Sequence, residues 1–249
     1  MSTPRLIGLS YSPWTEKARF ALDHHHVRYR YNEHLPMVGE ALLRIRSGRL
    51  FGKVSVPLLL HEGRTLGDSF EIARYAEELG DGAPLFPPRF SAEIRAWDDE
   101  SQAAMAAGRG RVIERTLASP EALAEGLPPF VPDALRGPAR GIAAVAARFL
   151  GRKYGGSDSA AAHARIAASL EALRGALGKQ RYLLGQLSFA DVAMAAVLQF
   201  VAPLGEPWFR LGPATTKAWS EPDLAERFVD LVAWRDDLYR EHRAPRARR

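Results

Sequence analysis

A segment rich in turn-forming residues divides the chain into two parts with different hydrophobic patterns. Between Gly80 and Phe90 the sequence reads Asp-Gly-Ala-Pro-Leu-Phe-Pro-Pro, which is typical of a linker because Gly and Pro end regular structure. Strand-like and helix-like segments alternate before it, whereas an Ala-, Leu- and Arg-rich sequence with helical periodicity follows it. We therefore predict an α/β domain over 1–80, a linker over 81–90 and an all-α domain over 91–249.

The first part is predicted to have the order βαβ, a connector, then ββα. Apolar runs of strand length and segments of helical spacing follow one another in that order. Gly63 in the short turn before the last strand indicates a hairpin. Asp68 and Glu71 are spaced as a capping box at the start of the last helix. The predicted strands are 5–10, 27–31, 56–60 and 65–66, and the predicted helices are 13–25 and 68–79.

The turn after the first strand carries a hydroxyl where a proline starts a helix. Ser12 is predicted to be the N-cap, because its oxygen can accept a hydrogen bond from an unpaired amide of the first turn. Pro13 suits the first helical position because its missing N–H would have been unpaired there. A capped helix start needs no further function, so a purely structural role for Ser12 stays open.

Pro57 interrupts an apolar run that otherwise reads as a strand. Proline cannot donate to a sheet ladder, so Pro57 must lie at an edge, a bulge or a tight turn. A cis peptide bond after Val56 is one way to place it. Only about one X–Pro bond in twenty is cis in folded proteins, so the residues alone leave this open.

The second part contains one strong local signal. Ser188 and Asp191 have capping-box spacing, and Leu187 and Val192 are placed to form a hydrophobic staple. The helix that follows is almost wholly apolar over 193–201, so we expect it to be buried on all sides and Asp191 to serve folding rather than chemistry. The predicted helices are about 91–118, 136–153, 159–178, 188–202 and 222–242, with a proline-containing loop at 117–135.

The composition restricts the possible classes of protein. The 249 residues are 47% hydrophobic and contain no Cys, so disulfides and thiolate metal sites are excluded and sulfur chemistry requires a bound thiol. Without a signal-peptide pattern or an apolar run near 18 residues, we expect a cytoplasmic protein with no membrane partner. The arginine-rich C-terminal end of the chain is predicted to be a solvated tail, and no nucleic-acid partner is expected. Its arginines are Arg240, Arg243, Arg246, Arg248 and Arg249.

The run His24-His25-His26 resembles a metal-binding cluster only superficially. Successive helical positions point about 100° apart, so the three rings cannot converge on one ion. We predict a helix end, where His suits the helix dipole, and no metal site.

Four motifs in order resemble the cytosolic glutathione transferase family. The resemblance covers 5–80 well and about 160–240 moderately, with no clear match over 113–160. It implies a thioredoxin-like first domain, a helical second domain, a cis Val56-Pro57 peptide and, commonly, a homodimer. The motifs are S-P-W-T-x-K-A-R at 12–19, V-P-L-L at 56–59, D-S-F-E-I-A-R-Y at 68–75 and G-Q-L-S-F-A-D at 185–191.

The resemblance implies glutathione as the co-substrate. A free thiol has a pKa near 8.5, so nucleophilic attack at neutral pH requires a site that stabilises the thiolate. The Ser12 hydroxyl and the positive end of its helix would both do so. Thr15 ranks second because it lies three residues into the same helix, and Ser10 and Tyr11 are further rivals. Serine rather than cysteine at position 12 favours conjugation, isomerisation or dehalogenation over reduction.

The resemblance also implies partners for the rest of the tripeptide. The backbone at Val56, before Pro57, would pair with the cysteinyl part like an added strand. Ser69 and neighbouring amides would hold the γ-glutamyl carboxylate, with Asp68 facing the α-amino group. A helix cap alone is the alternative for Asp68 and Ser69. Lys53 is the predicted contact for the glycine carboxylate. The alternatives to Lys53 are His34, Arg44 and Arg46.

The leading hypothesis is a glutathione transferase that attacks a hydrophobic electrophile bound by the helical domain. The alternatives are a glutathione-dependent isomerase or dehalogenase, and a non-catalytic glutathione- or ligand-binding dimer of the same fold. The residues proposed for the electrophile pocket are also candidates for the core. They are Trp97, Met105, Arg109, Trp208 and Phe209.

Overall fold

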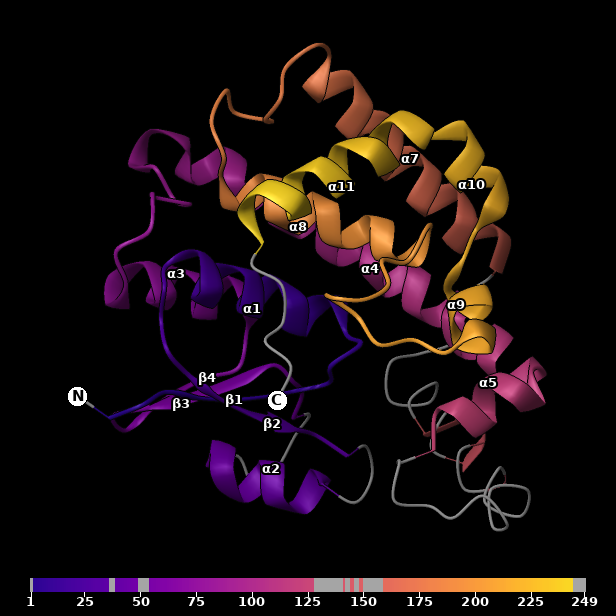
Figure 1. The fold of residues 1–249 in the computed structure, drawn as a ribbon, viewed down its shortest axis with the longest axis horizontal. Helices are drawn as coiled ribbons and strands as arrows, with labels where there is room; N and C mark the ends of the chain where they lie inside the picture. Colours follow the sequence, from indigo (N-terminus) through magenta and orange to yellow (C-terminus); the bar gives the residue numbers. More distant parts are fainter. Residues whose placement is uncertain are drawn as a thin grey trace.

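A small mixed sheet with helices precedes a larger helical part in the computed structural model of the chain (Figure 1). The structure describes residues 2–35, 39–48, 54–127 and 159–243, together with positions 141, 144–145 and 148–149. This arrangement confirms the predicted fold class, a thioredoxin-like βαβ-ββα unit followed by an all-helical unit.

The four strands have the order β2-β1-β3-β4. β1 runs parallel to β2 and antiparallel to β3, and β3 runs antiparallel to β4. The parallel pair requires a crossover, which α1 (Pro13–His24) supplies, whereas β3 and β4 need only a tight turn. That turn has left-handed backbone at Glu62 (φ 48°) and Gly63 (φ 77°), as the hairpin prediction requires. The strands are β1 (Arg5–Gly8), β2 (Arg30–Glu33), β3 (Leu58–His61) and β4 (Arg64–Leu66).

Two elements of the first part differ from the prediction. The strand predicted over 27–31 begins only at Arg30, because Val27 still donates its N–H to Leu22 O (2.9 Å) and so closes the preceding helix. The connector contains an unpredicted helix, α2 (Glu40–Ser47), in which Leu43 alone is buried. A single buried residue in eight leaves little periodicity to detect.

Helices cover both faces of the sheet. α1 (Pro13–His24) and α3 (Ser69–Leu79) lie between the sheet and the helical part, whereas α2 (Glu40–Ser47) lies on the opposite face (Figure 1). α3 ends at Leu79 and α4 begins at Ser91, the two positions that flank the predicted linker.

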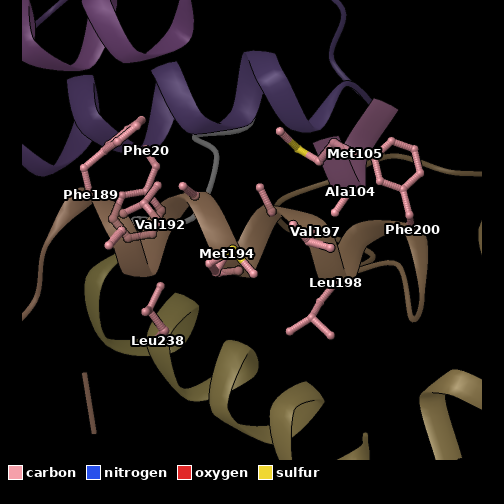
Figure 2. Close-up of a cluster of buried hydrophobic side chains, with 14 of the residues drawn as sticks. Phe20, Ala104, Met105, Phe189, Val192, Met194, Val197, Leu198, Phe200 and Leu238 are labelled. Carbon is pink, nitrogen blue, oxygen red and sulfur yellow. The ribbon is translucent and has the colours of Figure 1, made fainter. Parts of the chain in front are cut away.

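The helical part is built around α8. All residues of α8 are buried, which confirms the prediction of a helix enclosed on every side. Figure 2 shows Phe20 of α1, Met105 of α4 and Leu238 of α11 packed around it. The helices are α4 (Ser91–Ala118), α5 (Pro120–Glu125), α7 (Ser159–Leu177), α8 (Phe189–Val197), α9 (Pro213–Trp219), α10 (Pro222–Arg227) and α11 (Val229–His242), with short 3₁₀ turns η1 (Pro88–Phe90) and η2 (Leu198–Phe200).

Three predictions for the helical part are corrected. The loop predicted from 117 contains α5, since Ser119 caps a helix whose first residue is Pro120. The helix predicted over 222–242 is broken at Phe228, and α9 was not predicted. The helix predicted over 136–153 falls almost wholly outside the described residues.

Asp191 organises the start of α8. Ser188 donates to Asp191 Oδ2 through its backbone N–H at 2.9 Å and its hydroxyl at 2.8 Å. Leu183 N–H donates to Oδ1 at 2.8 Å. Burial raises the pKa of the Asp191 carboxyl to about 6, against the effect of these hydrogen bonds. The predicted capping box is present and structural.

The histidine run closes α1 as predicted. His24 contacts the Ala83 carbonyl at 2.9 Å, and His26 contacts Asp81 at 2.8 Å, so these rings have separate partners. His25 is 1% exposed and lies against Gly80, where an added Cβ would come within 1.8 Å of the His25 carbonyl oxygen. The end of α1 therefore packs tightly against the segment that leaves α3.

Acid should destabilise the fold through His25. Burial lowers the pKa of His25 from 6.5 to about 4. The unfolded chain therefore binds a proton that the folded chain does not, and stability is lost as pH falls from about 6.5 to 4. We expect His25→Phe to remove a pH-dependent loss on the order of 3 kcal/mol in the free energy of unfolding, measured by urea titrations across this range. A His25→Phe profile parallel to wild type would contradict the prediction.

The basic end differs from the predicted solvated tail at one position. Arg240 is exposed and pairs with Asp237 at 2.6 Å. Arg243 is only 2% exposed, so the prediction is wrong for this residue. Arg246, Arg248 and Arg249 lie outside the described residues. In the part of the chain that the structure describes, none of the helices is long and apolar enough to cross a membrane.

Candidate functional site

Ser12 lies at the N-cap of α1 with its side chain unused by the helix. Its backbone is extended (φ −81°, ψ 125°), as a cap requires, but its hydroxyl makes no capping hydrogen bond. The predicted side-chain cap is therefore wrong. Backbone bonds close the turn instead, from Ser12 N–H to Leu9 O (3.0 Å) and from Glu16 N–H to Ser12 O (2.9 Å). Ser12, a residue that is 9% exposed, thus places its hydroxyl at the positive end of a helix, available to a ligand.

Thr15 points back into the fold. Its hydroxyl accepts the Leu9 N–H at 3.2 Å, and the residue is 1% exposed. Gly8 makes this packing possible, because a Cβ there would lie 2.4 Å from Thr15 Cγ2. The geometry therefore favours Ser12 over Thr15 as a thiol contact, since the Thr15 oxygen already holds the end of β1.

The Val56-Pro57 peptide is cis, as the family resemblance implied. Val56 is partly exposed and Pro57 is buried. Strand pairing of β3 begins only at Leu58, so the backbone at Val56 has no strand beside it in the described sheet. An extended ligand can pair there by strand addition.

The start of α3 combines a satisfied cap with an unsatisfied hydroxyl. Asp68 Oδ1 accepts the N–H groups of Phe70 (2.8 Å) and Glu71 (3.3 Å). Ser69 is 2% exposed, and its hydroxyl has no hydrogen-bond partner among the described residues. Buried polar groups are nearly always paired, so this unpaired hydroxyl at the start of a helix is a candidate contact for an anionic ligand.

An aromatic wall joins the Ser12 turn to the helical part. It consists of Tyr11, Trp14, Phe200 and Trp219. Tyr11 meets Trp219 edge-on at 6.2 Å, and Trp14 meets Phe200 at 6.0 Å. Phe200 and Trp219 stack with centroids 5.0 Å apart and ring planes 6° apart. The two aromatic residues that flank Ser12 are therefore held by residues about 190 to 210 positions later in the chain.

Two models of known protein domains match the chain. The model for the N-terminal domain of glutathione S-transferase matches residues 11–79, and the model for its C-terminal domain matches 139–237. The two matches together span more than half of the chain. The chain belongs to the glutathione S-transferase family.

Individual members of the glutathione S-transferase family resemble parts of this chain. A probable glutathione S-transferase from Solanum tuberosum is 29% identical over 99 residues, or 39% of this chain and 44% of that protein. A probable glutathione S-transferase from Nicotiana tabacum is 31% identical over 99 residues, covering 39% of this chain and 43% of that protein. Each match spans less than half of the curated relative.

Solved structures of glutathione S-transferases share the fold over nearly the whole chain. A rice enzyme in complex with glutathione superposes with a TM-score of 0.63 at 19% identity, covering 98% of this chain and 92% of that one. A Methylobacterium radiotolerans glutathione S-transferase in complex with glutathione sulfonate gives 0.62 at 18% identity, covering 100% and 97%. At these identities the likeness shows the fold alone.

The residues predicted for the electrophile pocket of this glutathione S-transferase separate into two groups. The Arg109 guanidinium lies 4.8 Å from the Trp14 ring, so it borders the aromatic wall. Met105 and Phe209 are core residues at 0% and 1% exposure. Trp208 donates to the Arg243 carbonyl at 3.3 Å, and Trp97 packs against the core. The sequence analysis named Trp14 within its first motif and Tyr11 as a rival hydroxyl, but it did not identify their aromatic partners.

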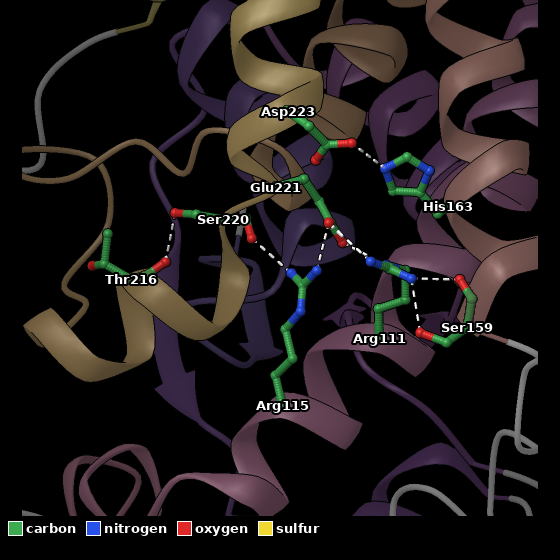
Figure 3. A network of polar contacts seen from close by, with 8 residues as sticks. All are labelled: Arg111, Arg115, Ser159, His163, Thr216, Ser220, Glu221 and Asp223. Carbon is green, nitrogen blue, oxygen red and sulfur yellow. Dashed lines mark hydrogen bonds and ion pairs between the residues drawn. The ribbon is translucent and has the colours of Figure 1, made fainter.

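A cluster of ion pairs around the buried Glu221 fixes the end of the aromatic wall. Figure 3 shows Glu221 between Arg111 and Arg115, each with a guanidinium nitrogen 2.5 Å from its carboxylate. Arg115 also donates to the Ser220 carbonyl at 2.6 Å. These contacts hold the junction of α9 and α10, directly after Trp219.

One group of metal-ligating side chains lies in the same cluster. His163, Glu221 and Asp223 have ligand atoms within 4.8 Å of one another. His163 already contacts Asp223 at 2.7 Å, and two guanidinium groups neutralise Glu221. Because these positive charges would repel a cation, we assign no metal to this cluster.

The predicted contacts for the glycine end of glutathione lie around α2. His34 is 8% exposed, with Nε2 4.0 Å from Glu40. Arg44 and Arg46 lie on α2 and are partly exposed. Lys53, the first choice from the sequence, lies outside the described residues, so this contact stays a prediction.

Proposed function

We propose that this glutathione S-transferase activates the thiol of glutathione at Ser12 for attack on a hydrophobic electrophile. The observation that carries the proposal is the uncommitted Ser12 hydroxyl at the N-terminus of α1, together with the unpaired buried hydroxyl of Ser69 at the start of α3, which packs against α1. Glutathione carries groups that suit both places, a thiol at its centre and a free carboxylate at its γ-glutamyl end.

Ser12 would donate its hydroxyl proton in a hydrogen bond to the sulfur. This bond and the positive end of α1 both favour the thiolate over the thiol, so the sulfur proton is released to water at neutral pH. The thiolate then forms a carbon–sulfur bond with the electrophile, whose leaving group departs or whose double bond takes up a proton. The protein contributes a stabilised nucleophile held in place.

The rest of the tripeptide would bind along the edge of the first domain. The γ-glutamyl carboxylate would accept from the Ser69 hydroxyl and α3 amides, and its amino group would face Asp68. The cysteinyl backbone would pair at Val56, before cis-Pro57. Lys53 would contact the glycine carboxylate, with His34, Arg44 and Arg46 as alternatives. The structures with bound glutathione and glutathione sulfonate support this choice of ligand.

The electrophile would lie against the aromatic wall. Tyr11 and Trp14 flank Ser12 in the chain, so a planar apolar substrate stacked on them is next to the sulfur. We also propose that the protein is cytoplasmic and acts as a homodimer. Sedimentation of the purified chain at micromolar concentration tests the dimer directly.

Replacement of Ser69 by Ala tests the proposed glutathione site. A hydrogen bond to a carboxylate contributes about 1.5–3 kcal/mol, so we expect the Kd and KM for glutathione to rise about tenfold or more with a smaller change in kcat. Calorimetric titration and conjugation kinetics with an aromatic electrophile measure both quantities. The exposed Ser91→Ala is the control. Failure of the wild type to bind glutathione would refute the proposal, and binding without turnover would identify a non-catalytic glutathione-binding protein instead.

A further inference from the structure

The guanidinium of Arg243 joins the far end of the helical part to the helix that begins at Ser12. Arg243 Nε lies 2.6 Å from Glu16 Oε1, and its Nη1 binds Asp23, although these partners are 227 and 220 positions away. The Arg243 and Glu16 side chains are each 1% exposed. The Arg243 backbone is also fixed, because its N–H donates to Tyr239 O at 3.0 Å.

Glu16 lies one turn from the proposed thiol site. Its backbone N–H makes the first hydrogen bond of α1, to the Ser12 carbonyl at 2.9 Å. Two consecutive bonds therefore connect Ser12 to Arg243, one through the Glu16 backbone and one through its carboxylate. A negative charge on a residue one helical turn from a developing thiolate would oppose its formation unless a cation neutralises it.

We propose that Arg243 is a positioning residue for thiol activation, because it neutralises Glu16 and holds the first turn of α1 so that the thiolate at Ser12 is favoured. This inference rests on the proposed function. Arg243 acts through Glu16 and does not itself touch glutathione.

Arg243 belongs to a cluster of charged groups that includes Glu16, Asp23 and Arg19. Burial alone would lower the pKa of the Arg243 guanidinium, but the carboxylates of Glu16 and Asp23 raise it far above its ordinary value. Burial raises the pKa of the Asp23 carboxyl, and the positive charges of Arg243 and Arg19 partly offset this rise. Tyr29 also belongs to this cluster, because its hydroxyl oxygen accepts a hydrogen bond from Arg19 Nε at 3.3 Å.

The neighbouring cation on α1 is already paired. Lys17 is fully buried, and its ammonium lies 2.5 Å from Asp98 on α4 and 3.3 Å from Ser101. Burial lowers the pKa of Lys17, while the carboxylates of Asp98 and Asp68 oppose that shift. Lys17 is thus committed to the carboxylates of α4 and α3, whereas Arg243 lies 2.6 Å from Glu16.

A pair of truncations that differ by one residue tests the inference. One chain ends at Arg243 and the other ends at His242, and the pKa of the bound glutathione thiol is measured in each from its ultraviolet thiolate absorbance. We expect the first to match the full chain and the second, like Arg243→Gln, to raise the bound-thiol pKa by about one unit. Conjugation kcat/KM should fall about tenfold at pH 7 and recover toward the full-chain value at alkaline pH.

Point variants separate charge from packing. Arg243→Lys should restore most of the thiol pKa, and the double variant Glu16→Gln with Arg243→Gln should return it close to the full-chain value. Arg240→Gln, which removes an exposed arginine, is the control. An unchanged bound-thiol pKa in Arg243→Gln would overturn the inference, even if the protein were less stable or slower. A full chain that neither binds glutathione nor conjugates it would overturn the proposed function itself.

Discussion

Replacing Ser12 with Ala is expected to slow glutathione conjugation about 10²–10³-fold at neutral pH. The change removes a preorganised hydrogen-bond donor from the developing thiolate, and loss of one such donor typically has this effect. The Ser12 hydroxyl makes no capping bond in the fold, so its removal should leave the free energy of unfolding almost unchanged. Steady-state kinetics with an aromatic electrophile and urea unfolding measure the two effects.

Thr15→Val is the matched control for this experiment. It removes the rival hydroxyl but keeps the side-chain shape, and it leaves the Leu9 N–H without its 3.2 Å acceptor. We expect a loss of about 1 kcal/mol in stability and a conjugation rate within a few-fold of wild type. The reverse pattern, with a slow Thr15→Val and an unaffected Ser12→Ala, would assign the thiol contact to Thr15.

Asp191→Ala is expected to be the most destabilising single change considered. The substitution leaves three buried donors without an acceptor, namely the Ser188 hydroxyl, the Ser188 N–H and the Leu183 N–H. Unsatisfied buried groups cost about 1–3 kcal/mol each and are not fully additive, so we expect about 3–4 kcal/mol of lost stability. Urea denaturation followed by circular dichroism measures this loss.

The exposed Asp99 on α4 supplies the control for Asp191. Asp99→Ala should change the free energy of unfolding by less than about 0.5 kcal/mol, as expected for a surface residue. Asp191→Asn should fall between wild type and Asp191→Ala, because it retains one acceptor oxygen. An Asp191→Ala protein as stable as Asp99→Ala would show that α8 does not depend on this capping box.

Elements with local stop and start signals were predictable from the sequence. Pro13 marked the start of α1, Asp68 marked α3, and the Ser188–Asp191 pair marked α8. Elements that depend on distant partners were not predictable. α9 has only seven residues, and a carboxylate from α5 caps it, since Glu125 accepts the Ala214 and Thr215 N–H groups at 3.0 and 2.7 Å.

The same distinction between local signals and distant partners applies to the residues of the candidate site. Ser12 and Ser69 were found from motifs because each lies at the start of a helix, where a few neighbouring residues determine the geometry. The partners of Tyr11 in the aromatic wall were missed, because Trp219 approaches only through tertiary packing. Arg243 was assigned to a solvated tail for the same reason, as its carboxylate partner Glu16 lies at the other end of the chain.

A crystal structure with bound glutathione tests the central claim most directly. We predict that the sulfur lies about 3 Å from the Ser12 hydroxyl oxygen, with the γ-glutamyl carboxylate at Ser69 and the cysteinyl backbone beside Val56. A sulfur atom placed against Thr15, Ser10 or Tyr11, with the Ser12 hydroxyl turned away from it, would contradict the account.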